Sequence, residues 1–130
     1  MILLDTHVLL WLISDLEKLS ATARKRLLDA RNEGEALAIS CITLWEVTLL
    51  AGKNRIEIAT TLESLLQELE IHFSVLPITS GTCLRALEFP PEYPRDPVDR
   101  IIGATAVAEG LTLITADRKI LASQAVQSLW

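Results

Sequence analysis

Short apolar runs and amphipathic stretches alternate along the whole chain. Apolar runs without polar alternation are typical of strands buried on both faces of a sheet; they occur at residues 1–4, 36–40, 73–78, 111–115 and 126–130. Helical patterns lie between them, at residues 6–13, 20–32, 42–51, 61–71, 79–87, 97–109 and 118–122. This order predicts an α/β fold, with a mostly parallel central sheet of four to five strands covered by helices on both faces.

One segment interrupts this alternation. Residues 89–97 contain four prolines and form the one clear loop, and loops carry function more often than the elements they join. Asp96 and Pro97 then start a helix by the usual signals, an acid at the N-cap and proline at the first helical position. Gly110 ends that helix. In the same helix Gly103, Ala104 and Ala106 are small, and we expect them to let the helix pack closely on the sheet.

Four acids stand where the chain changes direction. Asp5 and Asp117 each follow an apolar run, Glu46 lies six residues after another, and Asp99 begins the helix that leads to Asp117. Ligands of open parallel sheets bind beyond the carboxyl ends of the strands. We therefore expect these four carboxylates to converge there.

Each acid also has an ordinary structural interpretation. Asp5 and Asp117 are placed to cap helices, and Asp99 falls at the third helical position, where a carboxylate complements the helix dipole. Asp96 is best explained as an N-cap alone. Glu46 suits a solvated position beside Trp45.

The combination is better explained by a metal site, because unpaired buried charge is costly. Carboxylates hold hard cations such as Mg²⁺ or Mn²⁺. Such ions lower the pKa of a bound water and stabilise charge on a phosphate ester. This chemistry needs no nucleophilic side chain, and we expect His7 and His72 to have surface or packing roles.

Bulk composition limits the classes of protein. The 130 residues are 50% hydrophobic and 22% charged, which indicates one folded domain over residues 1–130 rather than a disordered chain. No apolar run is long enough to cross a membrane and no signal peptide is evident, so we expect a cytoplasmic location. Cys41 and Cys83 lack metal or disulfide spacing and are predicted to be buried free thiols.

Four blocks of sequence, in order along the chain, closely resemble the PIN-domain family and its VapC-type toxins. They are Leu3-Leu4-Asp5-Thr6-His7-Val8-Leu9-Leu10-Trp11, Ser40-Cys41-Ile42-Thr43-Leu44-Trp45-Glu46, the stretch from Asp96 to Ala106, and Leu113-Ile114-Thr115-Ala116-Asp117. The resemblance spans essentially the whole chain.

The resemblance implies a three-layer α/β/α sandwich and a Mg²⁺- or Mn²⁺-dependent endoribonuclease. The metal-binding acids of the family fall on Asp5, Glu46, Asp99 and Asp117, and a site hydroxyl falls on Thr115. It also implies a small antitoxin partner, which would be bound by the region after Gly52 and around residues 61–71. The family further implies a homodimer, and a hetero-oligomer with the antitoxin on operator DNA.

Thr6 and Thr43 are further hydroxyls placed to orient a carboxylate. The net charge of −5 argues against an extended basic footprint for nucleic acid. We expect RNA to be contacted by the metal and by a few local cations: Arg55, Arg95, Arg100 and Arg118.

Three alternatives remain open from the sequence. The first is a nuclease of the same fold with a non-toxin, RNA-processing or DNA-cleaving role. The second is a phosphoryl-accepting module with Asp5 as acceptor, which is disfavoured because His7 stands where such hydrolases need a second acid. The third is a binding module in which the acids only cap helices.

Overall fold

The computed structural model describes all 130 residues, Met1–Trp130. Its strands are β1 (Ile2–Leu4), β2 (Leu37–Ser40), β3 (Ser74–Leu76), β4 (Leu113–Ile114) and β5 (Ser128–Leu129). Its helices are α1 (Thr6–Ser14), α2 (Ala21–Asn32), α3 (Cys41–Gly52), α4 (Leu62–His72), α5 (Ser80–Glu88), α6 (Pro97–Glu109) and α7 (Arg118–Ala122), with a 3₁₀ turn at Leu16–Lys18 that the sequence pattern did not predict.

The five strands form one sheet in the order β3-β2-β1-β4-β5, and every neighbouring pair is parallel. The predicted parallel α/β sheet is therefore confirmed, with strands shorter than their apolar runs. The chain builds outward from β1 to β3 on one side and then crosses to β4 on the other. The direction of winding reverses between β1 and β4, and in open parallel sheets ligands bind beyond the carboxyl ends of the strands at such a point.

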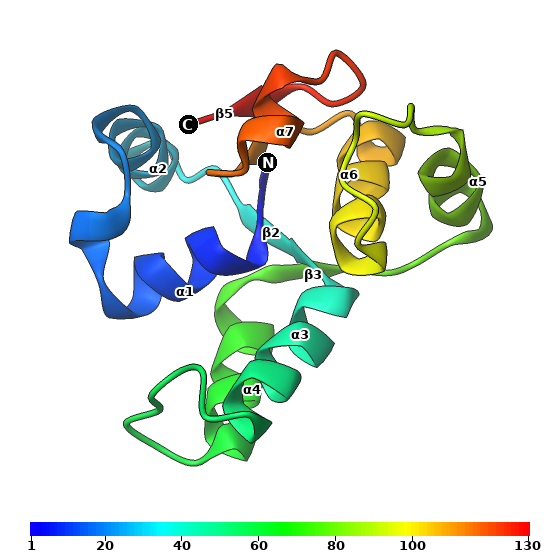
Figure 1. Ribbon diagram of the computed structural model, residues 1–130. Helices are drawn as coiled ribbons and strands as arrows, with labels where there is room; N and C mark the ends of the chain where they lie inside the picture. Colours follow the sequence, from blue (N-terminus) through cyan, green and yellow to red (C-terminus); the bar gives the residue numbers. More distant parts are fainter.

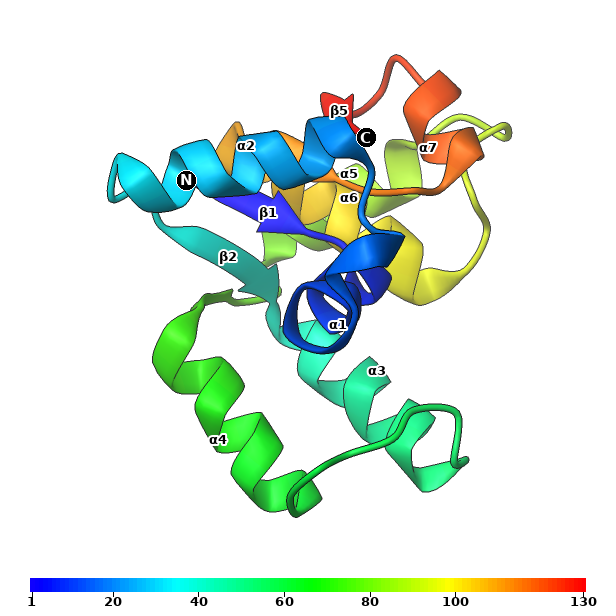
Figure 2. The ribbon, with the colours of Figure 1, turned by 90° about the vertical axis from the view of Figure 1, so that its left-hand side faces the viewer.

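Side chains of β1 alternate between two hydrophobic cores. Ile2 and Leu4 pack with residues of α1 and α2 on one face of the sheet. Leu3 packs with Ile102 and Ala106 of α6 on the other face. Full burial of each aliphatic side chain contributes about 1.5–3 kcal/mol. Figures 1 and 2 show the resulting three layers, with α1 and α2 on one side of the strands and α6 on the other.

Helices α3 and α4 form a hairpin that projects from the sheet (Figures 1 and 2). Its helices pack on each other through α3·α4 contacts, and α3 also touches α1 and α6. Helix α3 ends at Gly52. Residues 53–61 connect α3 to α4 as a loop, and Thr61 caps α4 by accepting a hydrogen bond from the Ser64 amide.

Helix α5 lies outside α6, so this side of the molecule has an additional layer (Figure 1). Two leucines of this helix are exposed beside charged residues: Leu84 is 62% exposed and Leu87 is 83% exposed. The prediction of buried thiols was wrong for Cys83, which is exposed on this helix, and Cys41 is only half-buried. Helix α5 packs on α6 through one face only, so side chains on its opposite face have no further layer to cover them.

The expected role of Gly103 was also wrong. A side chain at Gly103 would meet Tyr93 and Phe89 of the proline-rich loop rather than the sheet. Ala104 and Ala106 are buried as expected. None of the helices combines the length and the apolar character that crossing a bilayer requires.

Candidate active site

Asp5 lies directly after β1 and is buried, with 8% of its surface exposed. Its Oδ1 accepts a hydrogen bond from the Thr6 amide at 2.9 Å, as the N-cap of α1, and its Oδ2 accepts one from the Thr115 hydroxyl at 2.7 Å. Burial raises the pKa of Asp5, and these two hydrogen bonds only partly oppose it. A buried carboxylate held in one orientation by two donors is suited to ligand binding.

Asp117 follows β4 and caps α7. One of its oxygens accepts hydrogen bonds from the amides of Lys119, at 2.8 Å, and Ile120, at 3.2 Å. The Asp117 amide in turn donates to the Thr115 hydroxyl at 3.1 Å. Thr115 therefore joins two acids: its hydroxyl donates to Asp5 and accepts from Asp117. The sequence offered Thr115 as a hydroxyl of the site, and these two contacts are the ones it makes there.

Glu46 lies on α3, half-buried, and faces the same region. Burial raises its pKa, the nearby Thr6 hydroxyl and His7 lower it, and the charge of Asp5 raises it further. The Thr6 hydroxyl donates to the Thr43 hydroxyl at 3.2 Å, and both threonines are fully buried. This hydrogen bond joins the first residue of α1 to α3. It therefore holds Asp5, the N-cap of α1, at a fixed distance from the helix that carries Glu46.

Asp99 has the most perturbed carboxylate of the four. Burial, followed by the charges of Asp5, Asp96, Glu46 and Asp117, raises its pKa from 3.8 to about 7. Its amide donates to Asp96 Oδ1 at 3.2 Å, which confirms Asp96 as the N-cap of α6. None of the hydrogen bonds in the structure ends on the Asp99 carboxylate itself.

These four acids, hereafter the acid cluster, come together at the carboxyl ends of β1, β2 and β4. As their side chains stand, no three acidic, histidine or cysteine groups are arranged to hold one ion. Mg²⁺ itself needs only one or two direct carboxylates and keeps several waters. The donor set fits such a cation: hard oxygen ligands, a mutual repulsion that raises the pKa of Asp99, and a carboxylate on Asp99 that has no other partner.

The four predicted RNA-contacting arginines are not equivalent. Arg55, Arg95 and Arg118 are exposed in loops or at a helix start. Arg100 is half-buried, and its Nη1 donates to the Ala86 carbonyl at 3.2 Å, which links α6 to α5. Only the first three have guanidinium groups free of hydrogen bonds to the protein.

Two residues near the acid cluster were underestimated or missed from the sequence. His7 is exposed on α1, and its charge acts on both Asp5 and Glu46, while its ring lies 6.2 Å from that of Trp11. A surface or packing role was predicted for His7; the structure places it at the surface and also beside two of the acids. Tyr93 was not identified at all, although the chain's single tyrosine inside a proline-rich loop was a usable signal.

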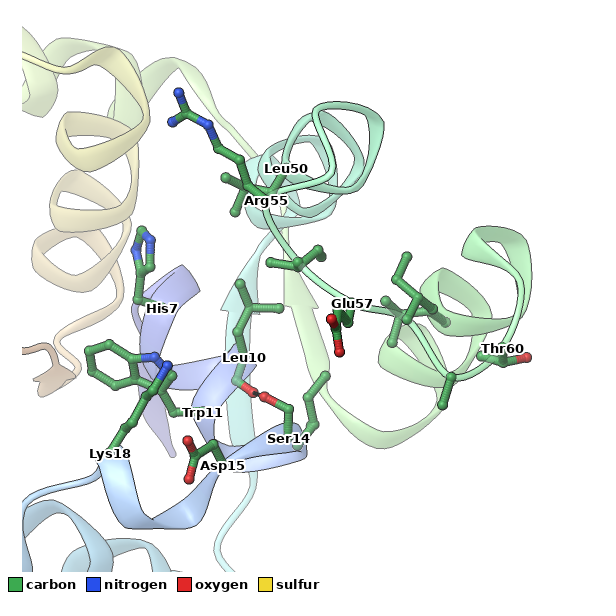
Figure 3. Close-up of a pocket in the computed structure, with 15 residues that line it drawn as sticks. His7, Leu10, Trp11, Ser14, Asp15, Lys18, Leu50, Arg55, Glu57 and Thr60 are labelled. Atoms are coloured by element: carbon green, nitrogen blue, oxygen red, sulfur yellow. Dashed lines mark hydrogen bonds between the residues drawn. The ribbon is translucent and has the colours of Figure 1, made fainter.

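A cavity of about 1020 Å³ is lined by His7 and other residues of α1 (Figure 3). The rest of its wall comes from the 3₁₀ turn after α1, the end of α3, the loop that follows and α4. Apolar side chains such as Leu10, Leu50 and Ile56 line it, together with Arg55 and Lys18. Part of this cavity lies in the region after Gly52 and around residues 61–71, which the family resemblance predicts to contact the antitoxin.

The comparisons with known proteins agree with this architecture. The PIN domain model matches residues 2–125. Ribonuclease VapC22 of Mycobacterium tuberculosis is 35% identical over 119 residues, which cover 92% of this chain and 88% of that protein.

Two solved structures are similar to the fold. A toxin–antitoxin complex from Klebsiella pneumoniae is 27% identical with a TM-score of 0.68, covering 97% of this chain and 95% of its own. VapBC2 from Rickettsia felis, bound to a DNA fragment from its promoter, is 19% identical with a TM-score of 0.72, covering 100% and 99%. The sequence match over nearly all of the chain and the shared fold lead to one conclusion: this chain belongs to the PIN-domain family.

Proposed function

We propose that this chain is a divalent-metal-dependent endoribonuclease and the toxin of a toxin–antitoxin pair. The acid cluster carries the proposal, because four carboxylates from four different elements gather and none of them forms an ion pair with a basic side chain. The relative named as a ribonuclease supports RNA as the substrate. The toxin–antitoxin complexes among the similar structures support a small antitoxin partner that also binds operator DNA.

Asp5, Glu46, Asp99 and Asp117 would hold Mg²⁺ or Mn²⁺ in this function. When bound, the cation supplies an activated water and stabilises the negative charge of the scissile phosphate. Thr115 keeps Asp5 and Asp117 in register, and the Thr6–Thr43 pair fixes α1 against α3. Arg55, Arg95 and Arg118 are the free cations that would contact phosphates beside the cluster.

The cavity between α1 and the α3–α4 hairpin is the proposed place for the antitoxin. Its apolar walls suit the apolar face of a peptide, and His7, whose charge acts on Asp5 and Glu46, is one of its lining residues. A peptide bound there would extend past His7 toward these acids and block access of RNA to the site.

The test of the enzymatic part uses purified protein and a fluorescent RNA pool. We expect cleavage with Mg²⁺, none with EDTA, and none with Asp99→Asn. Asp96→Asn is the matched control in the same helix turn, since asparagine caps a helix about as well as aspartate. Equal cleavage by the parent and Asp99→Asn would disprove the metal site.

The toxin role is tested in cells. Expression of the parent chain should arrest growth, Asp99→Asn should not, and co-expression of the small protein encoded next to it should restore growth. RNA cleavage in vitro without growth arrest would indicate the RNA-processing alternative instead.

A further inference from the structure

Tyr93, the chain's single tyrosine, is buried in a surface loop. Only 1% of its surface is exposed, although it belongs to the proline-rich segment between α5 and α6. Its amide donates to the Pro90 carbonyl at 3.0 Å, which closes a turn. Its ring packs on that of Phe89, with the two ring centroids 4.2 Å apart. Figure 1 shows this segment running alongside α6. The loop is therefore arranged to press one phenol ring against that helix.

The phenol reaches α6 at two residues that are one turn apart. Its hydroxyl donates to the Asp99 carbonyl at 3.3 Å. The same oxygen lies 2.0 Å from the point where a Cβ on Gly103 would stand, and the adjoining ring carbon lies 2.8 Å from it. Real Cβ atoms do not come so close to other heavy atoms. Glycine at 103 is thus what lets the hydroxyl reach the backbone of Asp99.

Asp99 depends on its backbone more than the other acids do. Asp5 accepts hydrogen bonds on both carboxylate oxygens, and Asp117 accepts two on one oxygen. The Asp99 carboxylate accepts none, so only its main chain determines where it lies. That main chain is held from two sides: Asp96 accepts from the Asp99 amide, and Tyr93 donates to the Asp99 carbonyl.

The surroundings of the hydroxyl agree with this position. Burial raises the pKa of Tyr93, and the charges of Asp5, Asp99 and Asp117 raise it further. The phenol therefore stays protonated and remains a donor, within electrostatic reach of three members of the acid cluster.

We propose that Tyr93 is a positioning residue of the acid cluster: its phenol, occupying the space left open at Gly103, fixes the first turn of α6 and thereby places Asp99 for metal binding. The inference rests on the proposed function, because it assigns Asp99 to the cation. Tyr93 does not touch substrate or metal. It acts through Asp99 alone, in the way that groups behind metal ligands orient them.

Tyr93→Phe tests this with the least disturbance, since it removes one oxygen and keeps the ring on Phe89. We expect the dissociation constant for Mn²⁺, measured by titration calorimetry on the whole protein, to rise roughly tenfold, the lower end for loss of such an orienting contact. The Mg²⁺ concentration for half-maximal RNA cleavage should rise in parallel. The cleavage rate at saturating Mg²⁺ should return close to that of the parent.

Thr105→Val is the matched control on the same helix. The Thr105 hydroxyl is also buried and donates to a carbonyl of α6, that of Ile101, at 2.7 Å. Its loss should lower the midpoint of urea unfolding about as much as Tyr93→Phe does, and leave Mn²⁺ binding unchanged. If both variants weaken Mn²⁺ binding equally, or if neither does, Tyr93 has only a structural role and the inference fails.

A double-mutant cycle tests the contact at Gly103. Gly103→Ala should lower the unfolding midpoint and Mn²⁺ affinity strongly in the parent, and less strongly in Tyr93→Phe, where the overlapping oxygen is gone. Equal losses in the two backgrounds would overturn the assignment of that space to the phenol. If Gly103→Ala does not fold, the double variant still reports whether removing the oxygen restores folding.

Asp99→Asn separates failure of this inference from failure of the proposed function. If Asp99→Asn binds Mn²⁺ and cleaves RNA like the parent, Asp99 is not a metal ligand and both ideas fall. If Asp99→Asn loses binding while Tyr93→Phe keeps full affinity, the metal site stands and only the role of Tyr93 is refuted.

Discussion

Replacing Asp99 with asparagine is expected to stabilise the metal-free protein while abolishing its metal-dependent activity. In the folded chain, burial and the neighbouring acids raise the pKa of Asp99 to about 7, against 3.8 when it is free of them. An acid whose pKa is higher in the folded state binds protons more tightly there than in the unfolded chain. The free energy of unfolding therefore falls as the pH rises from about 3.8 to about 7.

The size of the effect follows from the pKa difference. At about 1.36 kcal/mol per pKa unit, the ionised Asp99 destabilises the fold by at most roughly 4 kcal/mol above pH 7. Asp99 is partly exposed, and discounting by half for solvent screening leaves about 2 kcal/mol. The favourable interaction of a negative charge with the N-terminus of α6 offsets roughly 0.5 kcal/mol of this. We expect Asp99→Asn to gain about 1.5 kcal/mol at pH 8.

Urea unfolding in EDTA, followed by circular dichroism at several pH values from 4 to 8, measures this gain. The curves of the parent and Asp99→Asn should nearly coincide at pH 4 and separate progressively as the pH rises. Asp96→Asn is the control: asparagine retains the cap, and the substitution removes only one of the charges that raise the pKa of Asp99. Its gain in stability at pH 8 should therefore be clearly smaller than that of Asp99→Asn.

Two results would refute the reasoning. One is an Asp99→Asn variant no more stable than the parent at pH 8, which would mean that neither burial nor the neighbouring carboxylates disfavour the ionised form of Asp99 in solution. The other is a gain of the same size at pH 4 and pH 8, because a pH-independent gain cannot arise from ionisation of Asp99.

Three further outcomes are expected. Mg²⁺ at one hundred times its dissociation constant should add about 2.7 kcal/mol to the stability of the parent and so raise its melting temperature, while that of Asp99→Asn stays unchanged. An equal rise in both proteins would place the ion elsewhere. Thr115→Val should cost about 1–3 kcal/mol in urea unfolding and weaken Mn²⁺ binding, because the Asp5 oxygen it serves is buried; parental Mn²⁺ affinity would show that this contact orients nothing. The affinity for single-stranded RNA should fall with salt at a slope near −2 on logarithmic axes, as about three phosphate contacts from Arg55, Arg95 and Arg118 require, and a slope beyond −5 would contradict this sparse contact.

Much of the site was readable from local patterns. An acid after an apolar strand and before a helix is visible in the chain itself, and so is its use as a cap. Asp5, Asp96 and Asp117 all cap helices as predicted. The alternation of strands and helices likewise fixes parallel pairing, because short connections through a helix return the chain in the same direction.

Distances between elements are not encoded in this way. The sequence does not show that one hydroxyl of Thr115 serves two acids, or that the Thr6 hydroxyl bonds to the Thr43 hydroxyl between α1 and α3. The apolar exposure of Leu87 and Cys83 was also invisible, since periodicity identifies the faces of a helix without showing whether another layer covers them.

What the sequence by itself determined is therefore the set of elements, the parallel direction of the strands and the candidate acids, three of them at strand or helix ends. Hydrophobic period, caps and turn residues act over a few positions, so these features are local. Only the tertiary structure decided how the acids influence one another. The raised pKa of Asp99 and the fit of Tyr93 against Gly103 both depend on parts of the chain packed together in space. Burial and repulsion between charges depend on these distances, which packing alone sets.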